Sequence, residues 1–402
     1  MSKAITAGAA PFEPDDGFDP LEQAFRVGIR SYLQELLEQE VTEALGRLRH
    51  GREAGAKGYR NGHRERTLVG TCRRVTLAVP RARIVEETGA REHRSALLPR
   101  YRRLTQKALS VIAGAYLAGV NTRRVRRALA SLFGGAVSKD TVSRAWRQVQ
   151  TDFAAWNQRD LGVEPIVRLI LDGTVVKVRL DRRATTLSIL VVLGVRADGQ
   201  KVLLGLRTMG GESQGAWREI LDDLIARGLR VPALVIVDGG KGLDAALASL
   251  WPQVPVQRCT VHKHRNLVAH APKRLHEEIA ADYRDMIYAA SAVEVQARRR
   301  AFLRKWKLKC RAVADSLEEA GDRLFTFLRY PESQWRSIRT TNAIERLHEE
   351  FKRRIKTQCV LPNAETACML FWALLANGQI TLRKVDGWQT LEQLPRPIDL
   401  AA

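Results

Sequence analysis

The segment that decides the fold is residues 165–208, PIVRLILDGTVVKVRLDRRATTLSILVVLGVRADGQKVLLGLRT. Three runs in it are short, rich in β-branched residues and separated by turn residues, which is typical of β-strands. The runs are 165–180, 185–196 and 201–208. Asp198-Gly199 predicts a tight hairpin turn between the second and third runs. We therefore expect three sequential strands with antiparallel pairing.

The stretch after these strands alternates helix and strand patterns. A helix is expected at 215–227, a short buried strand ends at Asp238, a second helix covers 242–251, and a further strand lies near 255–258. Three antiparallel strands followed by helix, strand, helix and strand predict an α/β fold with a ribonuclease-H-like core. Residues 265–330, mostly helical and charged, have the character of a helical insertion into that core.

Upstream of the core we expect a mostly helical N-terminal DNA-binding region. Residues 21–48 repeat apolar positions at helical spacing. Residues 49–66 are rich in glycine and arginine without periodicity, and we interpret them as an arm that lies along a phosphate backbone. The run RRVTLAVPRAR at 73–83 predicts a strand that ends at Pro80.

A helix-turn-helix pattern precedes the core. Helix patterns at 104–117 and 122–133 are followed by Gly134-Gly135 and by a helix that Ser138 caps. An ordinary helical hairpin is the alternative interpretation. In the helix-turn-helix interpretation, four side chains of the last helix face a DNA groove: Lys139, Thr141, Arg144 and Arg147.

These patterns divide the chain into consecutive parts. We predict a disordered acidic tail (1–20), N-terminal helices with a basic arm (21–103), a helix-turn-helix-like DNA-binding domain (104–160), a catalytic core (161–264 and 331–378), a helical insertion (265–330) and a C-terminal tail (379–402).

The charge of the chain indicates a polyanionic partner. Lysine and arginine number 66 against 44 aspartate and glutamate residues, a net charge of +22. Residues 49–103 alone hold 14 Arg and one Lys against five Glu. Such a clustered excess favours a nucleic acid partner, although an arginine-rich composition with a solvated surface is the plainer alternative.

The remaining composition indicates an intracellular protein without a membrane segment. The longest apolar run, 187–195, is far shorter than the roughly 20 residues of a membrane span. The acidic N-terminus lacks the apolar centre of a signal peptide. Five scattered cysteines without a Cys-x-x-Cys pair indicate a reducing compartment. We expect a cytoplasmic, nucleoid-associated protein.

Three carboxylates stand out as candidate metal ligands. Asp172 interrupts an apolar strand, Asp238 ends the fourth strand, and Glu345 begins a helix in RTTNAIERLHEEFKRR. Their oxygens suit Mg²⁺ or Mn²⁺, and two such ions are expected to drive phosphoryl transfer. Each has a structural alternative: a hairpin turn at Asp172-Gly173, a strand-to-helix turn at Asp238, and a helix cap for Glu345. Glu349 and Glu350 are rivals on the same helix.

Cys259 and His262 lie just past the fifth strand, with His264 and His270 nearby. Zinc is one interpretation, but the usual structural site needs a second ligand pair. The other interpretation is a buried cysteine and a histidine that touches DNA or the catalytic site.

Six basic residues near the carboxylates are candidate phosphate clamps, with a solvated basic face as the alternative. They are Lys177, Arg179, Arg339, Arg346, Arg353 and Arg354.

The chain resembles the Mutator-type bacterial insertion-sequence transposases over nearly its whole length. The motifs that carry the resemblance occur in this order: YRNGHRERTL, LAVPRAR, GVNTRRV, VSKDTVSR, LDGTVVKVR, GGESQGAW, LIARGL, VIVDGGKGL, RCTVHKHRN and YPESQWRSIRTTNAIERLHEEFKRR. The resemblance implies an Asp-Asp-Glu site at Asp172, Asp238 and Glu345, with Cys259 and His262 as the accompanying pair.

The resemblance also implies a mechanism and partners. Asp172 would bridge two Mg²⁺ or Mn²⁺ ions, Asp238 and Glu345 would hold one each, and His262 would orient a phosphate or a base. Water cleaves terminal inverted repeats of double-stranded DNA, and the freed 3′-hydroxyl then attacks target DNA. Two DNA ends must meet, so a homodimer or higher synaptic oligomer is expected. A nuclease of the same fold that does not join DNA, and a catalytically silent DNA-binding relic, are the alternatives.

Overall fold

The computed structural model describes most of the chain in two compact units. The described residues are 20–51, 57–70, 73–86, 89–99, 105, 108, 111–112, 129, 139–180, 183–355, 361, 363–378, 380–393 and 395–396. The first unit ends at Gln148 and the second begins at Val149. Each unit is described by itself below.

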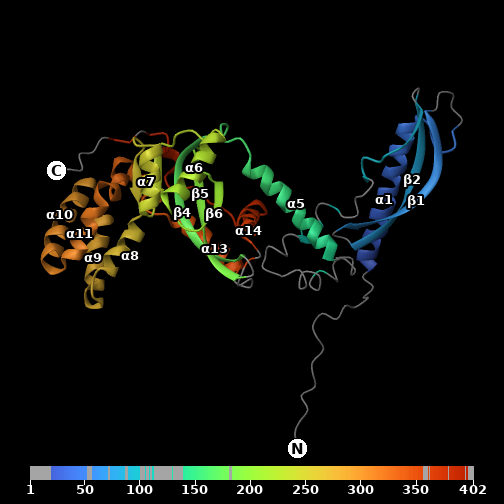
Figure 1. Cartoon of the computed structure of the whole chain (residues 1–402). Coiled ribbons are helices and arrows are strands. Elements are labelled where there is room, and N and C mark those ends of the chain that lie inside the picture. Colours follow the sequence, from blue (N-terminus) through green and yellow to red (C-terminus); the bar gives the residue numbers. More distant parts are fainter. Residues whose placement is uncertain are drawn as a thin grey trace, which may run out of the picture. The chain divides into compact units, whose positions relative to one another are not determined.

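The second unit is built on a five-stranded mixed sheet (Figure 1). Its strands are β4 (Ile166–Leu180), β5 (Arg183–Arg196), β6 (Lys201–Met209), β7 (Leu234–Val237) and β8 (Val256–Arg258). Their order across the sheet is β6-β5-β4-β7-β8, with β4, β5 and β6 antiparallel and β7 and β8 parallel to β4. The three expected strands are confirmed, and Gly199, at φ +85°, forms the expected hairpin turn between β5 and β6.

Helices cover both faces of this sheet, so its central strands are buried. Leu169 and Leu171 of β4 pack under α6 (Gln214–Ala226) and α7 (Lys241–Leu250) in one apolar core. Side chains alternate between the faces of a strand. Beyond the register shift between Ile166 and Arg168, even-numbered residues of β4 therefore point to the opposite face, where α13 (Asn342–Ile355) and α14 (Ala364–Ala376) contact the strand.

Further helices follow β8, in the part of the sequence where an insertion was expected (Figure 1). They are α8 (Thr260–Ala269), η1 (Lys273–Leu275), α9 (His276–Ile287), α10 (Ala292–Lys309), α11 (Arg311–Ala320), η2 (Gly321–Leu324), η3 (Thr326–Arg329) and α12 (Glu332–Ile338), with η4 (Trp388–Thr390) nearer the C-terminus. Among the described residues, none of the helices is both long and apolar enough to cross a membrane.

The first unit combines a helix with a sheet, which corrects the expectation of helices and an irregular arm. Helix α1 (Pro20–Leu45) packs on an antiparallel sheet of β1 (Gly58–Gly70), β2 (Arg73–Glu86) and β3 (Gly89–Glu92). Leu37 of α1 meets Leu77 and Val79 of β2 in its core. Residues 58–66, interpreted as an arm, belong to β1. Their polar side chains do not show the apolar pattern of a strand. The strand forms because pairing with a neighbouring strand outweighs the preference of the individual residues.

Proline does not end β2 as expected. Pro80 lies inside the strand and pairs with His63, beside a register shift between Arg60 and His63. Proline lacks an N–H to donate, and a bulge is one of the few places in a sheet that tolerate it.

The helix-turn-helix prediction lies almost wholly outside the described residues. Of its elements the structure describes α5 (Lys139–Asn157), which continues seven residues beyond the predicted end at 150. Arg144 and Arg147 are exposed on this helix, whereas the side chains of Lys139 and Thr141 are outside the described set.

Candidate active site beside strands β4, β7 and β8

Strand register brings the two candidate aspartates together. Leu171 of β4 pairs with Val237 of β7, so Asp172 and Asp238, each one residue further on, are neighbours across parallel strands. Because Leu171 and Val237 both enter the core under α6 and α7, the two aspartates project to the other face. Asp172 lies in the middle of β4, which excludes the hairpin-turn alternative at that position. Asp238 does begin the turn between β7 and α7, as the structural alternative expected. This position also leaves its carboxylate partly exposed, so the turn and a role as metal ligand are compatible.

The aspartate pair is electrostatically costly without a counter-charge. Burial of Asp172, whose residue is 7% exposed, and then the charge of neighbouring Asp238 together raise the pKa of its carboxyl from 3.8 to about 7. Each aspartate has one oxygen tied to the backbone. Gly173 N–H donates to Asp172 Oδ1 at 2.9 Å, and Gly240 N–H donates to Asp238 Oδ1 at 3.0 Å. The second oxygen of each carboxylate remains for another partner.

Two residues that the sequence did not single out flank Asp172. His348 Nδ1 lies 3.4 Å from Asp172 Oδ2, and burial lowers the pKa of this imidazole to about 3, so it is neutral at physiological pH. The carboxylate of Glu212 fills the space above Gly173, where a methyl group would come 2.1 Å from Glu212 Oε1. The spacing of His348 from Glu345, three residues along one helix, was a usable signal. Glu212 was visible in GGESQGAW, but nothing in its spacing tied it to Asp172.

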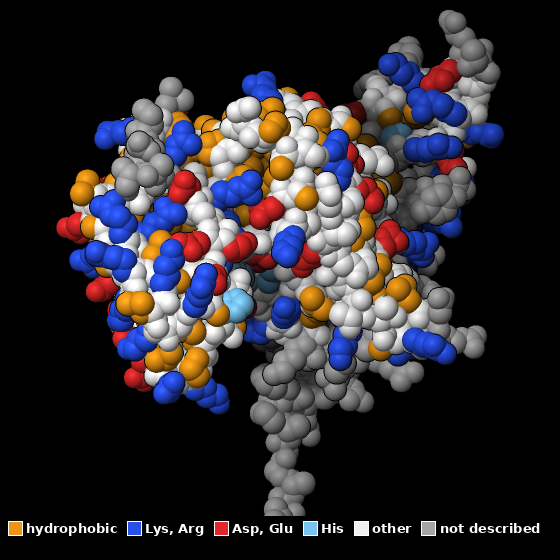
Figure 2. Space-filling model, turned by 60° about the vertical axis from the view of Figure 1, so that its left-hand side comes forward, with side chains coloured by type: hydrophobic (Ala, Val, Ile, Leu, Met, Phe, Trp, Pro, Cys, Tyr) orange, Lys and Arg blue, Asp and Glu red, His pale blue; other side chains and the backbone are white. Residues whose placement is uncertain are grey.

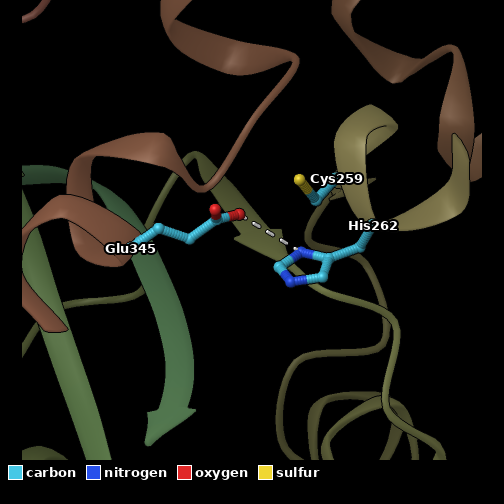
Figure 3. Close-up of side chains that lie close together, drawn as sticks. All are labelled: Cys259, His262 and Glu345. Atoms are coloured by element: carbon cyan, nitrogen blue, oxygen red, sulfur yellow. Dashed lines mark ion pairs between the residues drawn. The ribbon is translucent and has the colours of Figure 1, made fainter. Parts of the chain in front are cut away.

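Cys259 and His262 follow strand β8, which lies next to β7 in the sheet. The N–H of Cys259 donates to the Val237 carbonyl at 2.7 Å, which places Cys259 beside the end of β7. Cys259 is wholly buried and stands at the N-cap position of α8, one turn before His262. Cys259, His262 and Glu345 lie together, with one potential ligand atom from each mutually within 4.8 Å (Figure 3).

Glu345 is held by α8 and by the residue before its own helix. Glu345 Oε1 lies 3.6 Å from His262 Nδ1 (Figure 3). It also accepts from Thr341 Oγ1 at 3.2 Å, while Arg265 lies 3.5 Å from Oε2. The capping alternative with Asn342 does not hold, since Asn342 is already the first residue of α13. Of the rivals, Glu350 pairs with Arg353 and Arg354, and Glu349 is exposed.

The histidine of this cluster is charged at neutral pH. A hydrogen bond with Cys259, together with the charges of Cys259, Glu345 and Asp172, raises the pKa of His262 to about 9 against the effect of burial. Burial alone would raise the pKa of the Cys259 thiol, but its hydrogen bonds with His262 and Thr341 lower that pKa below the usual value. His264 packs instead against Tyr283, with ring centroids 5.3 Å apart, and His270 is the C-cap residue of α8.

The candidate phosphate clamps fall into different environments. Lys177 and Arg179 are exposed on β4, on the face opposite to Asp172. Arg346 and Arg353 are exposed on α13, whereas Arg354 is largely covered. The guanidinium of Arg339 lies within 5.5 Å of the ring centroids of Tyr288, Phe327 and Trp335, and it donates to the Ile287 carbonyl at 2.9 Å. Arg339 is thus held by one backbone carbonyl and three aromatic rings, while its buried Nε has no hydrogen-bond partner among the described residues.

Basic side chains of the helices after β8 are paired with acids. Lys305 contacts Glu278 and Asp282 at 2.9 and 2.6 Å, and Arg299 contacts Asp322 at 2.8 Å. Figure 2 shows the result on one face of the molecule, where Lys and Arg side chains are interspersed with Asp and Glu. On these helices, basic side chains therefore have local acidic partners and do not form an unbroken basic surface.

Comparison with known proteins identifies the family. The model of the family "Transposase, Mutator family" matches residues 14–382. The chain belongs to the Mutator family of transposases. The transposase for insertion sequence element ISRM5 of Rhizobium meliloti is 32% identical over 346 residues, which cover 86% of this chain and 85% of the relative. The transposase for IS406 of Burkholderia multivorans is 30% identical over 379 residues, 94% of this chain and 93% of the relative.

A third relative comes from a distant bacterium. The transposase for IS905 of Lactococcus lactis is 32% identical over 350 residues, 86% of each chain. Among solved structures, the catalytic core domain of HTLV-2 integrase in complex with magnesium matches 45% of this chain and 96% of its own, at 12% identity and a TM-score of 0.17. A superposition this limited carries no argument about the fold. Family membership makes this protein a DNA transposase, an enzyme that cuts and joins DNA.

Proposed function

We propose that this transposase cleaves the terminal inverted repeats of an insertion sequence and transfers the freed 3′ ends to target DNA, with Asp172, Asp238 and Glu345 as its metal-binding carboxylates. The observation that carries the proposal is that Asp172 and Asp238 each follow directly on the paired residues Leu171 and Val237, whose side chains enter the apolar core. The sheet order, with three antiparallel strands followed by two parallel ones, supports a ribonuclease-H-like core.

The aspartate pair fits a hard divalent cation such as Mg²⁺ or Mn²⁺. Both residues offer only oxygen, which these ions prefer. The raised pKa of Asp172 reflects burial and then repulsion from Asp238, and both costs fall when a cation lies between the carboxylates. When bound, two such ions activate the attacking oxygen and stabilise the leaving one. Asp172, Asp238 and Glu345 are the residues that would hold them.

The protein's own groups orient these ligands. The N–H groups of Gly173 and Gly240 each hold one aspartate oxygen. His348, neutral and buried, lies against the other oxygen of Asp172 and limits its rotation. Glu345, now held by His262 and Arg265, would have to turn toward the aspartates to serve as the third metal ligand. The cationic His262 would then be available to a phosphate or a base.

DNA outside the cleaved bond is held by exposed basic residues. We assign this role to Lys177, Arg179, Arg346 and Arg353, and to Arg144 and Arg147 in α5, all of which are exposed. Guanidinium and ammonium groups suit phosphate oxygens, and each phosphate contact steepens the salt dependence of binding. Two DNA ends must be cut and joined together, so the working form is a dimer or a larger synaptic assembly.

The test is cleavage and strand transfer of a labelled terminal-repeat duplex in Mg²⁺. Wild type is compared with Glu345→Gln, and Glu349→Gln, an exposed glutamate one turn further along α13, is the matched control. We expect wild type and Glu349→Gln to cut and join, and Glu345→Gln to bind the duplex but do neither.

Three outcomes contradict parts of the proposal. Full activity of Glu345→Gln shows that the third carboxylate lies elsewhere. Cleavage by wild type without joining identifies a nuclease. Binding without cleavage in any divalent metal identifies a DNA-binding relic.

A further inference from the structure

We infer that Cys259, His262 and Glu345 form a separate site for a thiophilic divalent cation such as Zn²⁺, and that its occupancy withdraws Glu345 from the aspartates. The withdrawal rests on the role proposed above for Glu345, whereas the binding of the cation does not. Sulfur, imidazole nitrogen and carboxylate oxygen form a ligand set that suits Zn²⁺ and is foreign to Mg²⁺.

The three side chains are close to the spacing that a tetrahedral zinc ion needs. Zn–S bonds of about 2.3 Å and Zn–N or Zn–O bonds of about 2.0–2.2 Å put neighbouring ligand atoms roughly 3.4–3.6 Å apart. One potential ligand atom from each residue already lies within 4.8 Å of the other two, and His262 Nδ1 lies 3.6 Å from Glu345 Oε1. Figure 3 shows the three side chains converging from α8 and α13. Small side-chain rotations complete the geometry and leave a fourth position for water.

One buried residue orients all three ligands. The N–H of Thr341 donates to Cys259 Sγ at 3.4 Å, and its hydroxyl lies 3.4 Å from His262 Nδ1 and donates to Glu345 Oε1 at 3.2 Å. Thr341 is itself inaccessible to solvent. A single residue that hydrogen-bonds to all three ligands fixes their positions relative to one another, as orienting residues do in metal sites. This second observation distinguishes the cluster from a chance meeting of polar side chains.

The surroundings also allow a cation to enter. His262 and Glu345 have side chains 27% and 21% exposed, so the cluster opens to solvent on their side. Arg265, the cation now nearest to Glu345, has a side chain that is 60% exposed and is free to swing outward. A bound ion would replace Arg265 as the counter-charge of Glu345 and would hold that carboxylate at α8.

The expected consequence is inhibition by zinc of a magnesium-dependent reaction. A carboxylate ligated at Cys259 and His262 cannot at the same time serve Asp172 and Asp238. Millimolar Mg²⁺ competes poorly for a site that contains a thiolate, because the ion prefers oxygen ligands and dehydrates reluctantly. Trace Zn²⁺ would therefore suppress DNA cleavage even where Mg²⁺ is abundant.

The binding test uses the full-length protein and Co²⁺ as a coloured substitute for Zn²⁺. A near-ultraviolet thiolate-to-cobalt absorption band is expected in wild type and in Cys310→Ser, which removes a partly exposed thiol outside the cluster. The band should vanish in Cys259→Ser. Its competitive loss as Zn²⁺ is added reports the zinc affinity. Loss of a true ligand should weaken that affinity by more than the roughly 10–100-fold that loss of an orienting residue costs.

A measurement on wild type alone covers the case in which Cys259→Ser does not fold. X-ray absorption at the zinc edge of the loaded protein should show one sulfur at about 2.3 Å together with nitrogen and oxygen neighbours. Absence of sulfur from this shell, or a cobalt band that survives in Cys259→Ser, overturns the site.

The inhibition test adds one equivalent of Zn²⁺ to the Mg²⁺ cleavage reaction and then removes it with a zinc-selective chelator. We expect at least a tenfold loss of rate that the chelator restores. Zinc that binds at the cluster without slowing cleavage overturns the withdrawal of Glu345. Absence of cleavage in Mg²⁺ alone counts against the proposed function, while the cobalt and X-ray results still decide the metal site.

Discussion

The two sides of the active site are built in different ways. On the strand side, Asp172 and Asp238 directly follow the paired residues Leu171 of β4 and Val237 of β7, and backbone N–H groups hold one oxygen of each. On the helix side, Glu345 stands on α13 and is held through side chains of other elements, His262 and Arg265 of α8 and Thr341.

This difference teaches which ligands are preorganised. Strand pairing fixes a neighbour to within the spacing of the ladder, about 4.7–4.9 Å, whatever else binds. A glutamate on a helix, in contrast, has a longer side chain and partners that another ligand can replace. The strand side therefore forms a standing half-site, and the helix side is the part that responds to substrate, metal and competing ions.

The largest expected effect comes from breaking the strand side. Asp172→Asn and Asp238→Asn each remove a negative charge from the metal site without changing its shape. We expect cleavage and strand transfer to fall by at least about 10³-fold, since stabilisation of charge at the reacting phosphate is lost. Affinity for the terminal-repeat duplex, measured by fluorescence anisotropy without metal, should change less than twofold. A variant that keeps a tenth of wild-type activity excludes that aspartate as a ligand.

The strand side should also show a stability cost that depends on pH. Because the folded-state pKa of Asp172 is raised from 3.8 to about 7, metal-free folding favours the protonated carboxyl. The contribution of Asp172 to the free energy of unfolding is then fully present below about pH 4 and is lost as the pH rises to 7. The loss is about 1.4 kcal/mol for each unit of pKa shift, on the order of 4 kcal/mol in all.

Denaturant unfolding at pH 4 and pH 8 measures this cost. Asp172→Asn should be the more stable protein at pH 8 without metal, and the advantage should shrink toward pH 4. Mg²⁺ should stabilise wild type at pH 8 and leave Asp172→Asn nearly unchanged. Equal free energies of unfolding for the two proteins at pH 8 would show that the ionised carboxylate of Asp172 does not destabilise the metal-free protein.

A smaller effect is expected from loosening the helix side. The carbonyl of Arg339 accepts from Thr260 N–H at 2.9 Å, and its guanidinium contacts three aromatic rings. Arg339→Ala should lower the free energy of unfolding by about 1–2 kcal/mol, the range expected for a partly desolvated cation–π contact. Arg336→Ala is the control, since Arg336 is 85% exposed and a surface ion pair contributes little.

The same pair of variants tests whether Arg339 binds DNA. Unchanged stability of Arg339→Ala, together with a loss of about one unit in the salt slope of DNA binding, would assign its guanidinium to a phosphate and not to the aromatic cluster.

Sequence patterns predicted the core better than they predicted the N-terminal unit. Strands β4, β5 and β6 were evident because apolar runs buried on both faces differ sharply from the turns between them. Strand β1 was not, since Gly58–Gly70 is mostly exposed and charged and gains its strand conformation from pairing with β2. The position of Pro80 likewise depends on a bulge in the partner strand that no local pattern announces.

The sequence by itself determined the order of elements, the family, and the residue types that stand within β4 and directly after β7 and β8. Short-range periodicity and motif order carry that information along the chain. Only the tertiary structure decided that Asp172 and Asp238 share a face, that His348 and Glu212 flank Asp172, and that Cys259, His262 and Glu345 meet through Thr341. These contacts join residues up to 176 positions apart, from Asp172 to His348. Their closeness follows from strand register and helix packing, which no local spacing in the chain specifies.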